Sequence, residues 1–284
     1  QGTAAVTTAG VINALRIVGK KKENVRITMI GAGASNIAIA RVLINFGIDP
    51  KHIVMCDSKD TLHKGRDDLK NDPTWKLKWH FCQITNEKSV KGGPPEACKG
   101  ADVMIALSKP GPDTVKGEWI ASMAKDPVVF VCANPIPEIS YEDAKAARAD
   151  VIMATGRSDY PNQVNNVLGF PFIFRGALDV RARAINEEMK IAATHALAAL
   201  AKEDAPDSVL RAYGVSRLRF GPEYIIPKPF DPRVLIWESS AVAEAAMKSG
   251  VAQLQIDLDE YREQLARRMG RTYEVMQSVL QRAK

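Results

Sequence analysis

The sequence predicts an α/β protein, with a doubly wound, parallel, Rossmann-like sheet followed by a helical C-terminal extension. Two observations carry this prediction. Short β-rich runs alternate with stretches of helical periodicity over the first 184 residues, which is typical of parallel sheets with crossover helices. Glycine or a polar residue also follows directly after five of these runs, where an open α/β sheet places its ligand-binding loops. These five residues are Gly31, Asp57, Ser108, Asn134 and Thr155.

Composition limits the classes of function. The chain has 284 residues, 46% of them hydrophobic and 25% charged, which is enough for one large or two modest globular domains. Its net charge of +6 comes from basic residues interleaved with acidic ones, so we expect no nucleic-acid binding. No apolar run is long enough to span a bilayer, and the first ten residues do not resemble a secretory signal. We therefore expect a cytoplasmic protein without membrane contact.

The cysteines and histidines indicate neither a redox centre nor a metal site. Cys56, Cys82, Cys98 and Cys132 lack CxxC spacing, and two of them lie in predicted strands, so we expect reduced, buried thiols. The four histidines are isolated from one another along the chain and form no metal-spaced pair. Surface or structural positions are expected for them.

The elements of the first part follow in order from a leading helix over residues 3–18, where apolar side chains recur with helical spacing. A second helix is predicted from Ala34 to Asn45, since Gly47 stops it, and a third from Tyr141 to Arg148. Residues 58–78 are polar and are predicted to be irregular. The runs predicted as strands are Val25–Ile30, Ile53–Cys56, Trp79–Ile84, Val103–Leu107, Val128–Cys132 and Val151–Ala154.

The pattern changes after residue 184, so we divide the chain into a nucleotide-binding sheet domain over residues 1–184 and a helical extension over residues 185–284. The extension is expected to pack on the sheet domain or on a part of the protein outside this chain. It is predicted to hold a helix over Ile185–Lys202, a proline-rich link over Pro222–Pro232, and two closing helices near 235–249 and 257–282.

A glycine-rich turn follows the first predicted strand and opens the second helix. Gly31 permits the tight turn, and Gly33 lets the backbone approach a pyrophosphate. Ala34 and Ser35 stand at the N-terminus of the helix, where free N–H groups favour binding of the anion. Asn36 stands where the dinucleotide fingerprint has a third glycine, so we expect slightly looser packing of helix on strand there. A plain turn is the alternative interpretation.

Asp57 ends the second predicted strand, 26 residues after Gly31. A carboxylate at this place accepts hydrogen bonds from the adenine-ribose hydroxyls, which favours NAD. Lys59 and Lys64 follow closely and offer charges for the 2′-phosphate of NADP, so the sequence leaves the choice of cofactor open. A solvated acidic turn is the alternative reading of Asp57.

Two further strands end in loops suited to the nicotinamide end of a cofactor. Ser108 begins a Ser-Lys-Pro-Gly loop, which we expect to pass the cofactor unless it is an ordinary turn. Asn134 precedes Pro135, which restrains its backbone. Its amide is a candidate contact for the nicotinamide ribose or for a substrate carboxylate, with a simple Asn-Pro turn as the alternative.

The loop from Ser158 to Asn166 carries short, mostly neutral hydrogen-bonding groups, suited to holding a small polar ligand without neutralising it. Asn165 and Asn166 stand at its end, before the apolar run Val167–Phe174. Amides on the edge of an apolar wall fit a ligand contact, and a structural role in fixing the loop is the alternative.

Five blocks of sequence are together similar to the bacterial-type malic enzymes. The similarity extends from residue 1 into the C-terminal helices and is weakest over residues 58–100. The blocks are QGTA at residues 1–4, GAGA at 31–34, ANPIPEI at 133–139, ATGRSDYPNQVNN at 154–166 and PKPFDPR at 227–233.

The resemblance implies an enzyme that oxidises malate with NAD or NADP and decarboxylates the bound oxaloacetate to pyruvate, using Mn²⁺ or Mg²⁺. Carried over by motif, Gly31–Ser35 would hold the pyrophosphate, Asp57 the adenine ribose, and Thr3 would face the cofactor. Asn134 and Asn166 would contact the substrate and the nicotinamide ribose.

The same resemblance places the family's other catalytic groups outside this chain. Its general-base lysine, proton-donating tyrosine and metal ligands belong to an N-terminal malic domain that precedes the QGT block. We therefore expect no acid/base residue and no metal ligand in this chain. We also expect the chain to be a part of a longer protein that extends beyond its N-terminus. The expected partners are that N-terminal domain and further copies in a homo-oligomer, with a C-terminal phosphotransacetylase-like domain as a further candidate.

Two alternatives to this interpretation stay open. One is another Rossmann-type dehydrogenase of hydroxy acids or amino acids, against which the Asn165-Asn166 block argues. The other is a non-catalytic nucleotide-sensing or oligomerisation module, which the missing catalytic residues would permit.

Overall fold

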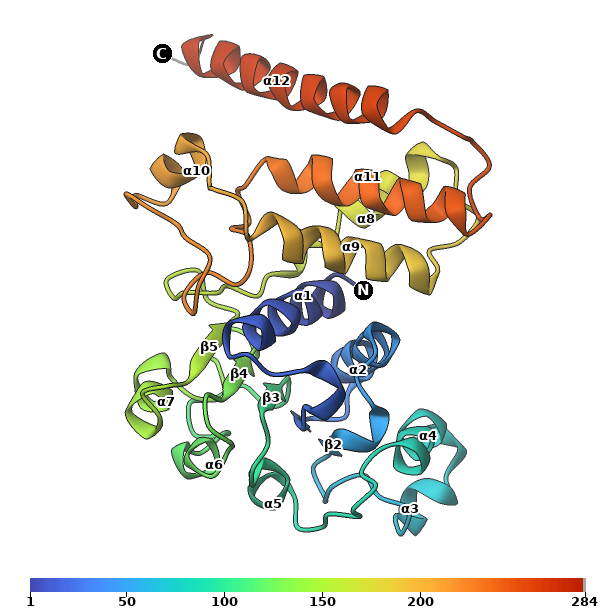
Figure 1. The fold of residues 1–284 in the computed structure, drawn as a ribbon, viewed down its shortest axis with the longest axis vertical. Helices are drawn as coiled ribbons and strands as arrows, with labels where there is room; N and C mark the ends of the chain where they lie inside the picture. Colours follow the sequence, from blue (N-terminus) through green and yellow to red (C-terminus); the bar gives the residue numbers. More distant parts are fainter. Residues whose placement is uncertain (283–284) are drawn as a thin grey trace.

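The computed structural model describes residues 1–282, with side chains described as far as residue 270, and a five-stranded sheet forms its centre (Figure 1). The strand order is β2-β1-β3-β4-β5, and every neighbouring pair is parallel. This confirms the predicted doubly wound parallel sheet. The strands are β1 (Ile27–Ile30), β2 (Ile53–Cys56), β3 (Val103–Ala106), β4 (Val128–Val131) and β5 (Ile152–Thr155).

Helices cover both faces of the sheet, which explains why every strand residue is buried and why the strands read as continuous apolar runs. Ile105 and Phe130 point to one face, into the core that α1 and α2 share. Met104 and Val129 point to the other, toward α5, α6 and α7. The helices named here are α1 (Gly2–Ile17), α2 (Ala34–Phe46), α5 (Pro94–Cys98), α6 (Gly117–Ala121) and α7 (Tyr141–Ala147).

Helix α1 is the centre of the molecule, since it lies between the sheet and the C-terminal helices (Figure 1). A Cβ added at Gly10 would stand 2.9 Å from both the Phe130 ring and Ile226, so glycine lets the helix approach the sheet closely. The Asn13 amide donates to the backbone oxygens of Ala198 and Ile225, both at 2.9 Å. These contacts fix the C-terminal part on the first helix.

The C-terminal part is helical, as predicted. Leu197 of helix α9 belongs to the same buried cluster as Ile105 and Phe130 of the sheet. The division of the chain at residue 184 stays a prediction. The helices are α8 (Phe172–Asp179), α9 (Glu187–Leu200), α10 (Asp207–Ala212), α11 (Arg233–Lys248) and α12 (Leu258–Arg282).

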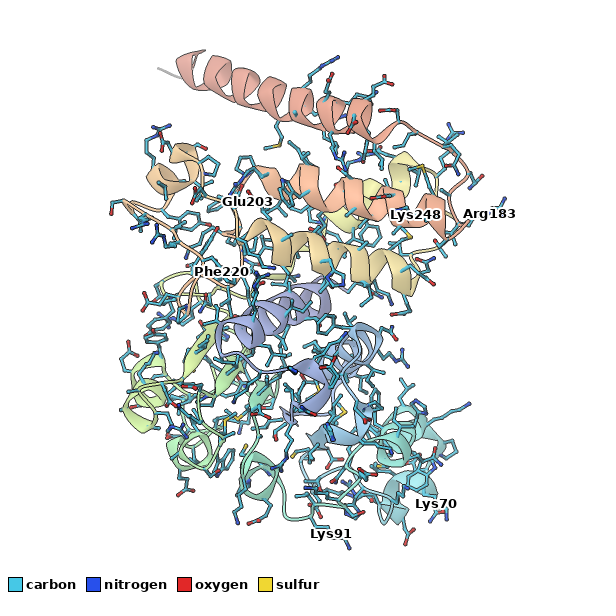
Figure 2. All side chains as sticks on the ribbon, viewed as in Figure 1. Lys70, Lys91, Arg183, Glu203, Phe220 and Lys248 are labelled. Carbon is cyan, nitrogen blue, oxygen red and sulfur yellow. The ribbon has the colours of Figure 1, made fainter. Side chains whose placement is uncertain are left out.

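The strand predicted over Trp79–Ile84 is wrong, because these residues belong to helix α4 (Lys76–Ile84). Phe81, Cys82 and Thr85 are buried at helical spacing, and the Thr85 hydroxyl donates to the Phe81 oxygen at 2.6 Å. The preceding stretch, predicted as irregular, contains short helix α3 (Asp67–Lys70). Figure 2 places Lys70 and Lys91 of this region at the end of the molecule opposite α12.

All four cysteines are free and buried, which confirms the expectation of reduced thiols in the interior. Burial raises the pKa of Cys82 to about 11 and that of Cys98 to about 12, so both stay protonated and unreactive at neutral pH. Within the described part of the chain, no helix combines the length and apolar character needed to cross a membrane.

Candidate functional site

The turn after β1 lies at the point where the winding of the sheet reverses, between β2 on one side and β3 on the other. Gly31 has φ +96°, and its N–H donates to the Cys56 oxygen at 2.9 Å. A Cβ added there would stand 2.4 Å from the Leu107 oxygen. Only glycine combines this conformation with such a close approach to the end of β3. Open α/β sheets bind ligands at this place.

Gly33 and the first turn of α2 form a cradle of free backbone donors. Gly33 precedes the helix without a side-chain cap, and a Cβ added there would meet nothing within 4 Å. Gly33, Ala34 and Ser35 are exposed. The first N–H groups of a helix have no partner within it, and the helix dipole favours an anion beside them. A dinucleotide pyrophosphate therefore fits this cradle.

Asn36 has a role in the turn that the sequence did not indicate, while the looser packing of helix on strand expected there stays a prediction. Its side chain is fully buried, and its amide donates to the Ile30 oxygen at 2.9 Å and to the Gly31 oxygen at 2.7 Å. Asparagine here binds the turn directly, where glycine would only allow close packing. Its side chain therefore fixes the shape of the cradle.

Asp57 lies at the end of β2, as predicted, within a network of ions that the sequence did not indicate. Arg66 binds both carboxylate oxygens, at 3.1 and 3.0 Å, and Lys78 stands 3.4 Å from one of them. The backbone N–H groups of Lys59 and Asp60 donate to the same side chain. The carboxylate is only 6% exposed and already has several partners.

Charge compensation keeps Asp57 ionised. Burial acts to raise the pKa of this carboxyl, but hydrogen bonds from Arg66 and from the backbone outweigh it and lower the pKa below the ordinary value. Of the two lysines proposed for a 2′-phosphate, Lys59 pairs with Asp68 at 3.3 Å. Arg66 also binds Asp68, at 2.8 Å. Lys59, Arg66 and Lys78 are thus held by carboxylates, while Lys64, the other lysine proposed for the 2′-phosphate, is exposed.

A buried carboxylate that sequence reasoning did not single out joins the loops after β3 and β4. Glu138 is fully buried and accepts hydrogen bonds from the N–H groups of Ser108 at 3.0 Å and Ala133 at 3.1 Å. Burial raises its pKa, although these donors oppose the rise. The sequence feature that could have identified Glu138 is that it is the single acidic residue of the ANPIPEI block. Glu138 positions Ser108 and the neighbouring Asn134.

Asn134 lies against the loop after β5. Its peptide bond to Pro135 is cis, and a Cβ added at Gly156 would stand 2.9 Å from the Asn134 side-chain oxygen. The absence of a side chain at Gly156 therefore leaves room for the amide. The structure brings the polar groups of β3, β4 and β5 together at one edge of the sheet, as the sequence predicted.

Two amides in the polar loop after β5 take part in hydrogen bonds within the fold. Asn162 is buried; its amide donates to the oxygens of Met153 and Pro222, and its oxygen accepts from the Ile225 N–H. Asn165 accepts from the Val167 N–H. The structural alternative therefore applies to Asn162, whose side-chain groups are used within the fold, while a ligand contact at Asn165 stays a prediction.

Asn166 is exposed and lies beside the start of α1. A Cβ added at Gly2 would stand 2.6 Å from the Asn166 backbone oxygen, and one added at Gly169 would stand 2.9 Å from the Gly2 Cα. Thr3 follows directly. The two predicted residues farthest apart in sequence, Thr3 and Asn166, are thus neighbours.

The donors at this site do not suit a divalent metal. No group of three or more histidine, cysteine or acidic side chains that could hold a metal ion occurs among the residues whose placement is described. Mn²⁺ and Mg²⁺ require oxygen ligands such as carboxylates. What the described residues of the site offer is hydrogen bonding to a cofactor and to a polar substrate.

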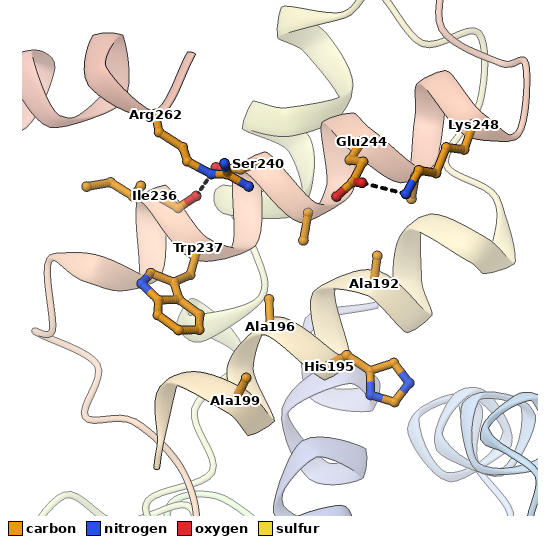
Figure 3. A pocket seen from close by; sticks show the side chains of 12 residues that line it. Ala192, His195, Ala196, Ala199, Ile236, Trp237, Ser240, Glu244, Lys248 and Arg262 are labelled. Atoms are coloured by element: carbon orange, nitrogen blue, oxygen red, sulfur yellow. Dashed lines mark hydrogen bonds and ion pairs between the residues drawn. The ribbon is translucent and has the colours of Figure 1, made fainter. Parts of the chain in front are cut away.

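A groove of about 760 Å³ lies between α9 and α11, apart from the loops that follow the strands (Figure 3). Alanines form much of its floor, and Trp237, His195 and the Glu244–Lys248 ion pair border it. Burial, with Lys22 and Lys202 nearby, lowers the pKa of His195. None of the predicted site residues lines the groove.

Comparison with known proteins agrees with this geometry. Residues 1–213 match the family described as malic enzyme, NAD binding domain. The chain is 53% identical to the NADP-dependent malic enzyme of Halomonas elongata over 89% of its length, and 43% identical to the NAD-dependent malic enzyme of Rhizobium meliloti over its whole length. It spans 57% and 36% of these two relatives, respectively.

Among solved structures, the malic enzyme of Entamoeba histolytica superposes with a TM-score of 0.89 and 44% identity. The match covers the whole of this chain and 55% of that one. Both the sheet domain and the C-terminal helices therefore have counterparts in that structure.

Proposed function

Because the chain belongs to the malic enzyme NAD-binding domain family, we propose that it is the nucleotide-binding half of an enzyme that converts malate to pyruvate and CO₂ while NAD or NADP is reduced. The glycine cradle at Gly31–Gly33, at the point where the sheet reverses, carries this proposal. Asn134 and Asn166 at neighbouring loops supply polar groups for the substrate.

The residues of this chain bind and orient the cofactor. The N–H groups from Gly33 to Ser35 hold the pyrophosphate at the start of α2, Asp57 stands at the adenine ribose, and Ser108 lies at the nicotinamide end. A nicotinamide held in this way would supply the hydride acceptor for the oxidation of malate at C2. Binding by fixed backbone donors places the ring without rearrangement, which lowers the entropic part of the barrier.

Asn134 and Asn166 orient the substrate. An amide donates a hydrogen bond to a carboxylate but leaves its negative charge in place, and the carboxylate lost as CO₂ must leave its bonding electrons behind. Thr3 borders the same place at the start of α1. Neutral amides thus suit a substrate whose charge is needed in the next step.

The remaining chemistry belongs in this proposal to an N-terminal malic domain, which would supply the lysine base, the tyrosine acid and the metal ligands. The same resemblance implies a cytoplasmic homo-oligomer. A different dehydrogenase or a sensing module is not favoured, because the similarity to malic enzymes covers the whole chain at 43–44% identity.

The test uses the complete protein with Asn134 or Asn166 replaced by alanine. Each change removes a donor to the malate carboxylate, so kcat/KM for malate should fall about tenfold or more, from a loss of ~1.4 kcal/mol or more of transition-state stabilisation. Steady-state kinetics and a thermal melt are measured together. The control is Asn24→Ala, on an exposed turn of the same chain.

Unchanged kinetics in both variants, or a fall in activity explained wholly by unfolding, would assign these amides to the scaffold. The proposed substrate site would then lose its support from this chain.

A further inference from the structure

The loop that follows β3 is held at both of its ends by one residue, Glu138. The Glu138 carboxylate accepts hydrogen bonds from the Ser108 N–H at 3.0 Å and from the Ser108 hydroxyl at 3.5 Å. The backbone oxygen of Glu138 accepts a third, from the Val115 N–H at 2.9 Å. Ser108 and Val115 begin and end the loop 108–115, so a residue from the segment after β4 closes this loop at its base.

Between these two ends the loop lies at the surface. Lys109, Pro110, Pro112 and Asp113 are exposed. The hydrogen bond that the Thr114 N–H donates to the Gly111 oxygen, at 3.1 Å, is internal to the loop. The position of the loop relative to the sheet is therefore set mainly at its base.

The base of the loop lies beside the cradle proposed for the dinucleotide. A Cβ added at Gly31 would stand 3.3 Å from the Ser108 Cα. A shift of Ser108 would therefore change the wall of the proposed cofactor site where the loop leaves β3.

The other oxygen of the same carboxylate holds the loop after β4. It accepts a hydrogen bond at 3.1 Å from the N–H of Ala133, the residue before Asn134. Glu138 is 0% exposed, so solvent does not replace a hydrogen bond that is lost there. Moving one loop alone would leave a buried polar group without its partner, which is unfavourable. The loops after β3 and β4 therefore keep a fixed position relative to one another.

We infer that Glu138 is a positioning residue for hydride transfer, which sets where the nicotinamide end of the cofactor lies relative to the substrate. The inference rests on the proposed function, because Ser108 and Asn134 are the proposed contacts of the nicotinamide end and of malate. Glu138 itself contacts neither ligand, since it is buried, and it acts through the N–H groups of Ser108 and Ala133.

The inference separates the rate of the reaction from the affinity for the cofactor. In the proposed site, affinity comes from the helix N-terminus at Gly33–Ser35 and from Asp57, which Glu138 does not touch. Loss of the link at Glu138 should therefore disturb the nicotinamide end while the pyrophosphate and adenosine contacts remain.

The test is Glu138→Gln in the complete protein. Glutamine keeps the size of the side chain, but its amide has one acceptor oxygen, and its NH₂ group would face a second N–H donor. One of the two loops is thus released. The matched control is Asp102→Asn, at the opposite end of β3, where the carboxylate accepts the Arg26 N–H at 2.9 Å. Glu138→Asp, which keeps the charge on a shorter side chain, takes the place of Glu138→Gln if that variant does not fold.

Two measurements are made on each variant. Titration with NADH or NADPH gives the number of sites per chain, the Kd and the emission of the bound nicotinamide. The number of sites and the Kd should stay close to those of the parent in Glu138→Gln, while the rise in emission on binding should be smaller, because the ring is held less firmly. Steady-state kinetics should show kcat per cofactor site about tenfold or more below that of the parent. Asp102→Asn should match the parent in both measurements.

Emission or kcat per site equal to the parent's, in a folded Glu138→Gln variant, would overturn the inference. A loss confined to the number of sites, or one that Asp102→Asn shares, would also overturn it, because Glu138 would then only support the fold. A parent that binds the cofactor but does not turn over malate would contradict the proposed function instead. The emission of the bound cofactor would still decide whether Glu138 positions its nicotinamide end.

Discussion

Asp57 shows how a residue can be located correctly while its surroundings remain unpredicted. Its position at the end of β2 follows from the strand pattern. Its partners do not, because Arg66 and Lys78 both lie within residues 58–78, which were predicted as irregular, and Lys78 is in fact part of helix α4. Glu138 and Asn36 are similar, since their roles depend on backbone groups that only the folded chain brings near.

Asp57→Asn should change the choice between cofactors. The amide keeps one oxygen for the backbone donors of the turn but removes the charge that compensates Arg66 and Lys78. The affinity for NAD should fall more than that for NADP, because a charge-assisted hydrogen bond to the ribose, worth roughly 1.5–3 kcal/mol, is lost and the uncompensated cations favour a 2′-phosphate. Fluorescence titration with both reduced cofactors measures the ratio.

The matched control is Asp68→Asn, which removes a carboxylate from the far side of Arg66. Equal and small effects of Asp57→Asn on the two affinities would show that Asp57 only anchors Arg66 and does not contact the ribose.

At the scale of elements, pattern and structure agree where a segment has one strong period. All five strands were predicted within two residues of their bounds, because each is a short apolar run buried on both faces. The exception, α4, is short and half exposed, so its few apolar residues do not define a helical period. The sequence is also a poor predictor of element boundaries that are set by capping hydrogen bonds or by tertiary contacts.

The turn between β1 and α2 gives a matched pair of glycine substitutions. Gly31→Ala should destabilise the fold by about 2 kcal/mol or more, because φ is positive and the new Cβ would collide with the Leu107 oxygen. Gly33→Ala should leave the melting temperature nearly unchanged, since φ is −86° and the space is open. It should nevertheless weaken dinucleotide binding about tenfold or more, because a methyl group would block the approach of the pyrophosphate.

Thermal melts and dinucleotide titrations of the two variants separate these effects. Normal dinucleotide affinity in a folded Gly33→Ala protein would remove the pyrophosphate from this turn.

Helix α11 carries a buried carboxyl group with no hydrogen-bond partner within the described chain, that of Glu238. Burial raises its pKa well above the ordinary value. The native state therefore binds this proton more tightly than the unfolded state, and the group's contribution to stability falls as pH rises above the unfolded-state pKa.

Glu238→Gln should remove this dependence and raise the free energy of unfolding more at pH 7 than at pH 5. The difference in the free energy of unfolding between variant and parent should change by at most about 1.4 kcal/mol per pH unit. Urea unfolding at the two pH values measures it, with Glu244→Gln, a partly exposed residue of the same helix that pairs with Lys248, as control. A stability difference that does not depend on pH would show that Glu238 is not protonated in the folded chain.

At the scale of the whole molecule, the chain is a five-stranded parallel sheet packed against a helical C-terminal part. The sequence pattern indicated both parts and the fold confirms them, while an active site shared with a further domain stays a proposal. The exposure of Val167, Phe170 and Phe174 was not foreseen, because the run Val167–Phe174 was interpreted as an apolar wall beside a ligand. Hydrophobicity alone does not distinguish an apolar residue of the core from one at the surface.

The central claim is that this chain holds the dinucleotide while the acid/base and metal groups lie outside it. One titration tests it most directly: NADH or NADPH is added to the 284-residue chain, its fluorescence is followed to saturation, and the same preparation is then assayed with malate, oxidised cofactor and Mn²⁺. We expect saturable binding of at least one reduced cofactor without turnover of malate. Absence of saturable binding, or robust turnover by this chain alone, would contradict the claim.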